Sequence, residues 1–363
     1  MSASLPTVVS GVRLGCEALE DRAVPAAAYA LSGASLLAFD TTDPTDTTET
    51  AITGVGANET LVGIDFRSTD GQLYGLGVNA SADQATLYTI SLDTGAATAV
   101  GTAGSIAFTD ATGKAVDLPA PAATGYAISF DAATDQFRVV TGTGLNFRID
   151  PVTGAPIDGD TGLAGSVSGI NPDGAINGLP AGATGVAGTA YTGTDQPGGP
   201  TTQYTLDAGA DALFIQGAGN SGTQSNKLPI TLNGAPLNFT AVSGFDIPDA
   251  VEVASAGAPA TGTAVAALAV GGTTRVYEID LTTGAATELG TAPAGIKSLV
   301  LSNVVPKTIA FTGDSFTGTE AGKSAVVTLT RTGDLSAAAT VSVLVSGGTA
   351  TDGSDFTGTS FVA

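Results

Sequence analysis

Short apolar runs of similar character open five successive stretches of the chain, at intervals of roughly 50 residues, a spacing typical of repeat proteins. In the complete repeats, a second apolar run, a third run of alternating character and a closing turn with a strand follow the first run. Four strands per repeat are typical of a β-propeller blade. The opening runs begin at Leu61 (LVGIDFRS), Gly125 (GYAISFDA), Val186 (VAGTAYTG), Ala241 (AVSGFDIP) and Gly295 (GIKSLVLS).

The third run of each repeat carries the clearest strand signal. In Thr86–Asp93 and Thr274–Asp280, large apolar residues recur at every second position, and a period of two predicts a β-strand. An Asp followed within a few positions by Thr-Gly comes next. Because an Asp side chain accepts backbone hydrogen bonds in a turn and glycine supplies positive φ, we interpret Asp93, Asp150 and Asp280 as hairpin formers rather than ligands.

The last opening run has no strands of its own after it, whereas Tyr29–Val55 contains three strands with no opening run. We therefore predict that Gly295–Ser302 is the innermost strand of the blade whose outer strands lie in Tyr29–Val55. This closure joins the chain ends and removes sheet edges that would otherwise be exposed. The sequence thus predicts an all-β protein with a five-bladed β-propeller over residues 29–304.

The pattern changes in two other places. Gly-, Pro- and Ser-rich stretches at Ser166–Gly185 and Gln216–Lys227 predict surface loops within the third repeat. Residues 305–363 no longer follow the repeat, and alternation in Ala325–Thr330 and Thr340–Val345 predicts strands of a partial immunoglobulin-like β-sandwich.

Composition narrows the possible partners and reactions. Acidic residues number 34 against 12 basic ones, a net charge of −22, and a field of this sign repels nucleic acid. The absence of histidine removes the commonest general base and every Ser-His-Asp or Cys-His arrangement. No run approaches the roughly 20 apolar residues of a membrane span, and the single cysteine, Cys16, excludes an intramolecular disulfide.

Asp65, Arg67 and Asp246 are the candidate polar residues of the propeller channel. Asp65 and Arg67 are two positions apart, hence on one face of an inner strand, and Asp246 occupies a comparable place in its own run. An Asp and an Arg in a narrow channel can bind a carboxylate or a sugar. The alternative is a structural ion pair between blades.

Ala30–Asn303 resembles the bacterial family known as domain of unknown function 4394. The resemblance implies an extracellular or cell-envelope propeller-like domain and transfers no activity. The segments that carry it are Gly63–Arg67, Leu73–Leu76, Tyr88–Gly101 and Phe147–Gly154.

The C-terminal segment is similar to a Calx-beta domain, through Glu320, the strands around Val327 and Val343, and the string Gly348–Phe356. The resemblance implies calcium binding by acidic residues at one end of the sandwich, with Glu320, Asp352 and Asp355 as candidate ligands. Ala363 falls about halfway through a domain of this type, so we expect calcium to bind only weakly.

Arg13–Ala26 (RLGCEALEDRAVPA) resembles the LEDR-x-x-PA leader of exported bacterial proteins. We interpret residues 1–28 as an export leader, with a disordered tail as the alternative, and predict a secreted or cell-surface location.

These observations predict a non-enzymatic extracellular or cell-surface protein for adhesion or binding, with an unknown extracellular protein or glycan as its partner. The alternative is a calcium-dependent propeller hydrolase or lyase acting on sugars or lactones.

Overall fold

The computed structural model describes residues 27–121, 125–161, 166–183, 185–194, 198–217 and 220–302, together with four short strands beyond residue 307. All regular elements within these ranges are β-strands. Pro25–Asn303 forms one compact unit and the segment from Val304 belongs to a second. Among the described residues, no helix is long and apolar enough to cross a membrane.

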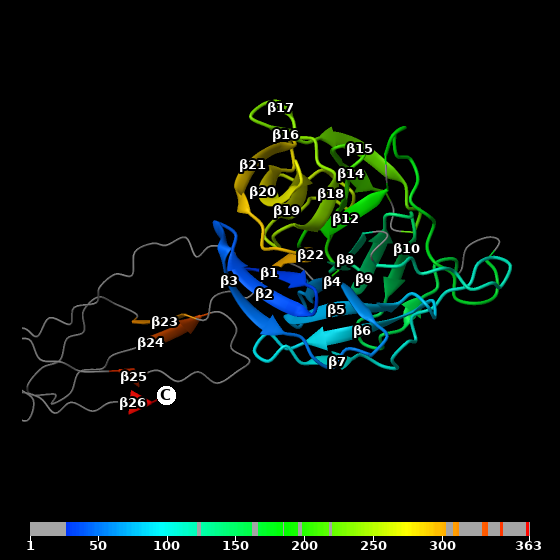
Figure 1. The fold of residues 1–363 in the computed structure, drawn as a ribbon, viewed down its shortest axis with the longest axis horizontal. Coiled ribbons are helices and arrows are strands. Elements are labelled where there is room, and N and C mark those ends of the chain that lie inside the picture. The colour runs from blue at the N-terminus through cyan, green and yellow to red at the C-terminus, as the bar shows by residue number, and fades with distance from the viewer. Residues whose placement is uncertain are drawn as a thin grey trace, which may run out of the picture. The chain divides into compact units, whose positions relative to one another are not determined.

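The first unit is a propeller of five antiparallel blades, named A to E (Figure 1). From the innermost strand outwards, blade A contains β22 (Ile296–Leu301), β1 (Ala27–Ser32), β2 (Ser35–Asp40) and β3 (Asp43–Ala51). Blade B contains β4 (Thr60–Arg67), β5 (Gln72–Asn79), β6 (Gln84–Ile90) and β7 (Ala97–Ala99). Blade C contains β8 (Tyr126–Asp131), β9 (Gln136–Thr141), β10 (Asn146–Ile149) and β11 (Pro156–Ile157).

Blade D contains β12 (Val186–Tyr191), β13 (Gln203–Asp207), β14 (Ala212–Gln216) and β15 (Gln224–Pro229). Blade E contains β18 (Ala241–Asp246), β19 (Thr263–Val270), β20 (Thr273–Asp280) and β21 (Ala285–Thr291). Two short strands, β16 (Thr231–Leu232) and β17 (Ala235–Pro236), extend blade E, with β16 parallel to β21. The five opening runs of the sequence are therefore the five innermost strands.

The predicted closure of the ring is confirmed. β22 pairs antiparallel with β1, with Ala30 opposite Leu299, so one blade combines the first and last strands of the propeller. The innermost strands then contact one another in the cyclic order β22, β4, β8, β12, β18. Blade A is consequently a complete four-stranded sheet, in which β22 takes the innermost position.

Apolar clusters fill four of the five blade interfaces. They lie between blades A and B, B and C, D and E, and E and A. Between blades C and D, the facing side chains include a polar set instead, such as Arg138 on β9 and Gln203 on β13, which both bond to Tyr191. The hydrophobic effect thus holds four interfaces together, and hydrogen bonds and charges are prominent in the fifth.

Glycines in the innermost strands allow neighbouring blades to approach closely. A Cβ atom on Gly244 of β18 would lie 2.4 Å from Leu299 Cβ of β22. A Cβ atom on Gly63 of β4 would lie 2.8 Å from Ile128 Cγ2 of β8. Any larger residue would push the inner strands apart, so these glycines keep the centre of the propeller narrow.

The hairpin turns hold as predicted in blades C and E. The Asp150 carboxylate accepts the N–H groups of Val152 and Thr153 at 2.8 and 2.9 Å, and Asp280 accepts the equivalent pair. In blade B the corresponding residue is Ser91, whose Oγ accepts the N–H of Thr94, not Asp93. The reason is register: the strand ends at Ile90, so the turn begins two residues earlier than the Asp-Thr-Gly string indicates.

In the second unit, β23 (Thr308–Phe311) pairs with β24 (Leu329–Thr332), and β25 (Ser342–Val343) pairs with β26 (Phe361–Val362). The candidate calcium ligands Glu320, Asp352 and Asp355 lie outside the described residues, as do Cys16 and the leader Arg13–Ala26. The sandwich, its calcium site and the export leader therefore stay predictions.

Candidate functional site

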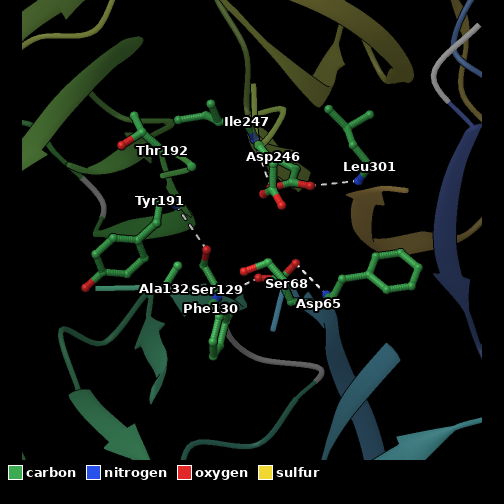
Figure 2. Close-up of a pocket in the computed structure, with 13 residues that line it drawn as sticks. Asp65, Ser68, Ser129, Phe130, Ala132, Tyr191, Thr192, Asp246, Ile247 and Leu301 are labelled. Atoms are coloured by element: carbon green, nitrogen blue, oxygen red, sulfur yellow. Dashed lines mark hydrogen bonds between the residues drawn. The ribbon is translucent and has the colours of Figure 1, made fainter. Parts of the chain in front are cut away.

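A small pocket lies at the centre of the propeller, where the innermost strands reach their carboxyl ends (Figure 2). Asp65 of β4 and Asp246 of β18 both line it, together with Ser129 of β8 and Asp249. Arg67, the third channel candidate, is not among the lining residues. The structure thus brings two of the three predicted channel residues into one site.

Each of the two aspartates links its own blade to the next one. Asp65 Oδ1 accepts the N–H of Phe66 at 2.8 Å, and Oδ2 accepts the N–H of Phe130 in blade C at 2.6 Å. Asp246 Oδ1 accepts the N–H of Ile247 at 2.8 Å, and Oδ2 accepts the N–H of Leu301 in blade A at 2.7 Å. Figure 2 shows the bonds to both neighbouring blades. Each of the two carboxyl groups therefore joins two neighbouring blades through hydrogen bonds.

In the other three blades, the residue at the equivalent strand position determines how the amide of the next blade is bonded. Ser129 in blade C accepts the N–H of Tyr191 in blade D through its Oγ at 3.1 Å. The equivalent residues of blades D and A are Ala190 and Val300, which have no acceptor. By this pattern Ala190 and Val300 would face the N–H groups of Ile247 and Phe66. These N–H groups donate instead to Asp246 and Asp65, the residues directly before them. Two double acceptors and one single acceptor thus satisfy five buried amides.

Burial dominates the electrostatics of the pocket. The pKa of Asp65 is raised from 3.8 to about 7, mainly by burial and to a smaller extent by the charge of Asp249, against the lowering effect of its backbone hydrogen bonds. The pKa of Asp246 is also raised well above its ordinary value, first by burial and then by the charge of Asp65. Two neighbouring carboxyls that resist ionisation titrate as a pair.

The size of the pocket limits what it can hold. Its cavity volume is about 20 Å³, which accommodates a water molecule or a small ion but is far below the several hundred Å³ typical of organic-ligand pockets. Within the described residues, no group of three or more His, Cys, Asp or Glu side chains is arranged to bind a metal ion.

Arg67 turns instead to the neighbouring blade. Its guanidinium contacts Asp135, in the β8–β9 turn of blade C, at 2.7 Å and Asp70 of its own blade at 2.6 Å. Arg67 and Asp65 therefore serve different partners, although they lie two residues apart on one strand. The geometry of Arg67 is that of an ion pair between blades.

A second charged cluster lies beside blade C and was not expected from the sequence. Asp173 is buried and receives hydrogen bonds from Arg138 of β9 and Arg148 of β10, which are directly opposite each other in the sheet. Asp173 belongs to the Ser166–Gly185 stretch. The prediction that this stretch is a surface loop is therefore wrong for its buried part, because the Gly- and Pro-rich composition conceals a carboxylate that neutralises two facing arginines.

The other predicted loop, Gln216–Lys227, also differs from expectation. It contains the start of β15, and the buried Gln224 in it bonds to Thr205 and Gln216. This stretch shows no apolar alternation in sequence because the side chains of β15 after Gln224 are mostly exposed, and Gln224 itself is buried through hydrogen bonds.

Comparison with known proteins gives a family but no activity. The family model described as "Domain of unknown function (DUF4394)" matches residues 35–300, and no curated protein matches the sequence. A solved structure of a protein from Lactobacillus plantarum is 15% identical, with a TM-score of 0.36 over 93% of this chain and 81% of that chain. The structure of a nidogen/laminin complex is 10% identical, with a TM-score of 0.41 over 76% and 98%.

The WD40 β-propeller domain of Doa1 is 11% identical, with a TM-score of 0.31 over 78% of this chain and 71% of that chain. The family model covers well over half of the sequence and includes blades B to E and most of blade A. The chain therefore belongs to the family described as domain of unknown function 4394.

Proposed function

We propose that the protein is a non-enzymatic binding protein, secreted or held at the cell surface, which engages an extracellular protein or glycan through the surface of its propeller. The observation that supports this proposal is the use of the channel acids. Asp65 and Asp246 each accept two backbone N–H groups, one from the next blade. Groups committed to holding blades together are poorly placed to act as nucleophile or base.

The dimensions of the pocket point in the same direction. A cavity of about 20 Å³ leaves no room for a substrate beside the carboxylates. Recognition is therefore assigned to the outer surface and loops, where propellers and other rigid β scaffolds commonly carry binding residues. Weak calcium binding by Glu320, Asp352 and Asp355 remains part of the proposal and rests on the resemblance to Calx-beta domains.

The second candidate is a calcium-dependent hydrolase or lyase acting on sugars or lactones. It is supported by the presence of Asp65, Asp246 and Asp249 around a single pocket, because calcium takes carboxylate ligands. This candidate requires the channel to open well beyond its present volume.

One experiment separates the two candidates. The purified chain is incubated with ester, lactone and glycoside substrates, with and without calcium chloride, and is tested in parallel on an array of glycans and purified matrix proteins. We expect binding without turnover. Calcium-dependent turnover that is lost in Asp65→Asn and in Asp246→Asn, but kept in the exposed control Asp46→Asn, would establish the enzyme instead.

A further inference from the structure

We propose a calcium site at the outer edge of blade C, with Asp160, Asn171 and Thr109 as side-chain ligands. The inference does not depend on the proposed function or on the C-terminal acids. Three segments of the propeller meet here: Phe108–Asp110 in the connection from blade B, Asp158–Thr161 directly after β11, and Ile170–Asn171. We call this meeting point the loop junction.

Hydrogen bonds hold the loop junction together. The N–H of Thr109 donates to Ile170 O at 2.8 Å, and Asn171 Nδ2 donates to Thr109 O at 2.7 Å. The Asp158 carboxylate receives the N–H of Asn171 at 3.1 Å and the hydroxyl of Thr161 at 2.5 Å. Asp158 thereby holds the segments of the loop junction in place, while Asp160, Asn171 and Thr109 would supply the ligand atoms.

The loop junction contains oxygen atoms that lack a partner. Among the described residues, the buried side-chain atoms without a hydrogen bond are Thr109 Oγ1, Asp160 Oδ1, Asn171 Oδ1 and, elsewhere in blade D, Gln216 Nε2. Three of these atoms are thus oxygens of the loop junction, and Asn171 is only 6% exposed. An unsatisfied buried polar atom costs about 1–3 kcal/mol. Three such atoms on neighbouring segments point to a bound group that the oxygens share.

The chemistry of these atoms selects a cation. The carboxylate oxygen of Asp160 and the amide oxygen of Asn171 only accept hydrogen bonds or coordinate metals, and the Thr109 hydroxyl can do so as well. Asp160 forms no ion pair within the described residues, and its other oxygen accepts the N–H of Val167 at 2.9 Å. A hard cation would satisfy all three oxygens and neutralise the carboxylate.

Calcium fits this donor set better than magnesium. Calcium accepts six to eight oxygens in flexible geometry, including neutral amide and carbonyl oxygens, whereas magnesium requires near-ideal octahedral geometry and keeps its waters. Backbone carbonyls and water would complete the coordination. With one carboxylate ligand, the site belongs at the weak end of protein calcium sites, with a dissociation constant of roughly 10⁻⁴–10⁻³ M.

The local sequence agrees with this assignment. Asp158-Gly159-Asp160-Thr161 places aspartates at the first and third positions of a loop, as calcium-binding loops often do. In this protein the first aspartate organises the loop through hydrogen bonds and the third-position aspartate faces the candidate ion.

The test is calorimetric titration of calcium chloride into the full chain. The starting protein carries Glu320→Gln, Asp352→Asn and Asp355→Asn, so that the C-terminal candidates do not contribute. Asp160→Asn and Thr109→Val are then added singly, and Asp46→Asn is the matched control because it removes one exposed charge from β3. Thermal unfolding in EDTA verifies that each variant is folded.

We expect the starting protein and the Asp46→Asn control to bind one equivalent of calcium. Asp160→Asn should abolish this binding, and Thr109→Val should weaken it by roughly tenfold or more, the scale seen when groups around a metal are removed. Equal heats of calcium binding in the starting protein and in Asp160→Asn, or no binding heat at millimolar calcium, would overturn the proposal. The three unpaired oxygens would then be assigned to bound water. Equal affinity for magnesium chloride would overturn the assignment to calcium.

Discussion

Asp65→Asn isolates the energetic effect of a buried charge at the centre of the propeller. In the folded protein the pKa of Asp65 rises from 3.8 to about 7 because the carboxyl is buried. The folded state therefore holds this proton more tightly than the unfolded chain does. The resulting contribution to stability is fully present below about pH 4 and is lost as the pH rises to about 7.

The size of the effect follows from the same two pKa values. At about 1.4 kcal/mol per pKa unit, the rise from 3.8 to about 7 corresponds to about 4 kcal/mol. Asparagine cannot ionise, so the variant lacks this pH dependence. Its amide has one acceptor oxygen, however, and leaves either Phe66 or Phe130 without a partner for its N–H, at a cost of about 1–3 kcal/mol. Relative to the wild type, the variant should gain about 4 kcal/mol in unfolding free energy between pH 4 and pH 8.

Urea unfolding of both proteins at pH 4, 6 and 8 measures this gain. Asp280→Asn is the control, because backbone N–H groups of Thr283 and Thr282 lower the pKa of Asp280. The stability that Asp280 contributes is present above about pH 4 and is lost only at lower pH, so its removal should cost nearly the same at pH 6 and pH 8 and should not reproduce the pH-dependent gain of Asp65→Asn. Parallel pH profiles of the wild type and Asp65→Asn would refute the assignment of a buried, proton-holding carboxyl.

Two further substitutions test the blade interfaces by chemical denaturation. Gly244→Ala should destabilise the protein by about 1–3 kcal/mol through overpacking, since the new Cβ would lie 2.4 Å from Leu299 Cβ. The control Gly217→Ala should have a small effect, because no atom lies closer than 3.5 Å to its new Cβ. Equal losses of stability in the two variants would contradict the close approach of blades E and A. Asp173→Ala should cost about 3–5 kcal/mol because it leaves the buried Arg138 and the facing, half-buried Arg148 without their anion. Asp135→Ala leaves its arginine paired with a second aspartate and should cost less. A loss at Asp173 no larger than at Asp135 would contradict the structural role of the buried cluster.

Part of the central site could be predicted from the sequence because it belongs to the repeat. Asp65 and Asp246 are charged residues at equivalent positions of otherwise apolar innermost strands, and the repeat brings those strands to one axis. The partner of Arg67 could not be predicted, since Asp135 lies 68 residues away in a turn of the next blade. Asp173 and Asn171 were missed for a related reason: they lie in a Gly- and Pro-rich stretch without periodicity, and nothing local to them indicates burial.

The sequence by itself determined the strands, the number of blades and the closure of the ring. Alternation with a period of two depends only on which side chains must avoid water, and a blade that lacks its innermost strand must recruit one from elsewhere in the chain. The tertiary structure alone decided what the polar residues do. Whether Asp65 faces a ligand or the N–H of Phe130 depends on how closely β4 and β8 approach each other. Small residues such as Gly63 set that distance, which emerges only when strands remote in sequence pack around a common axis.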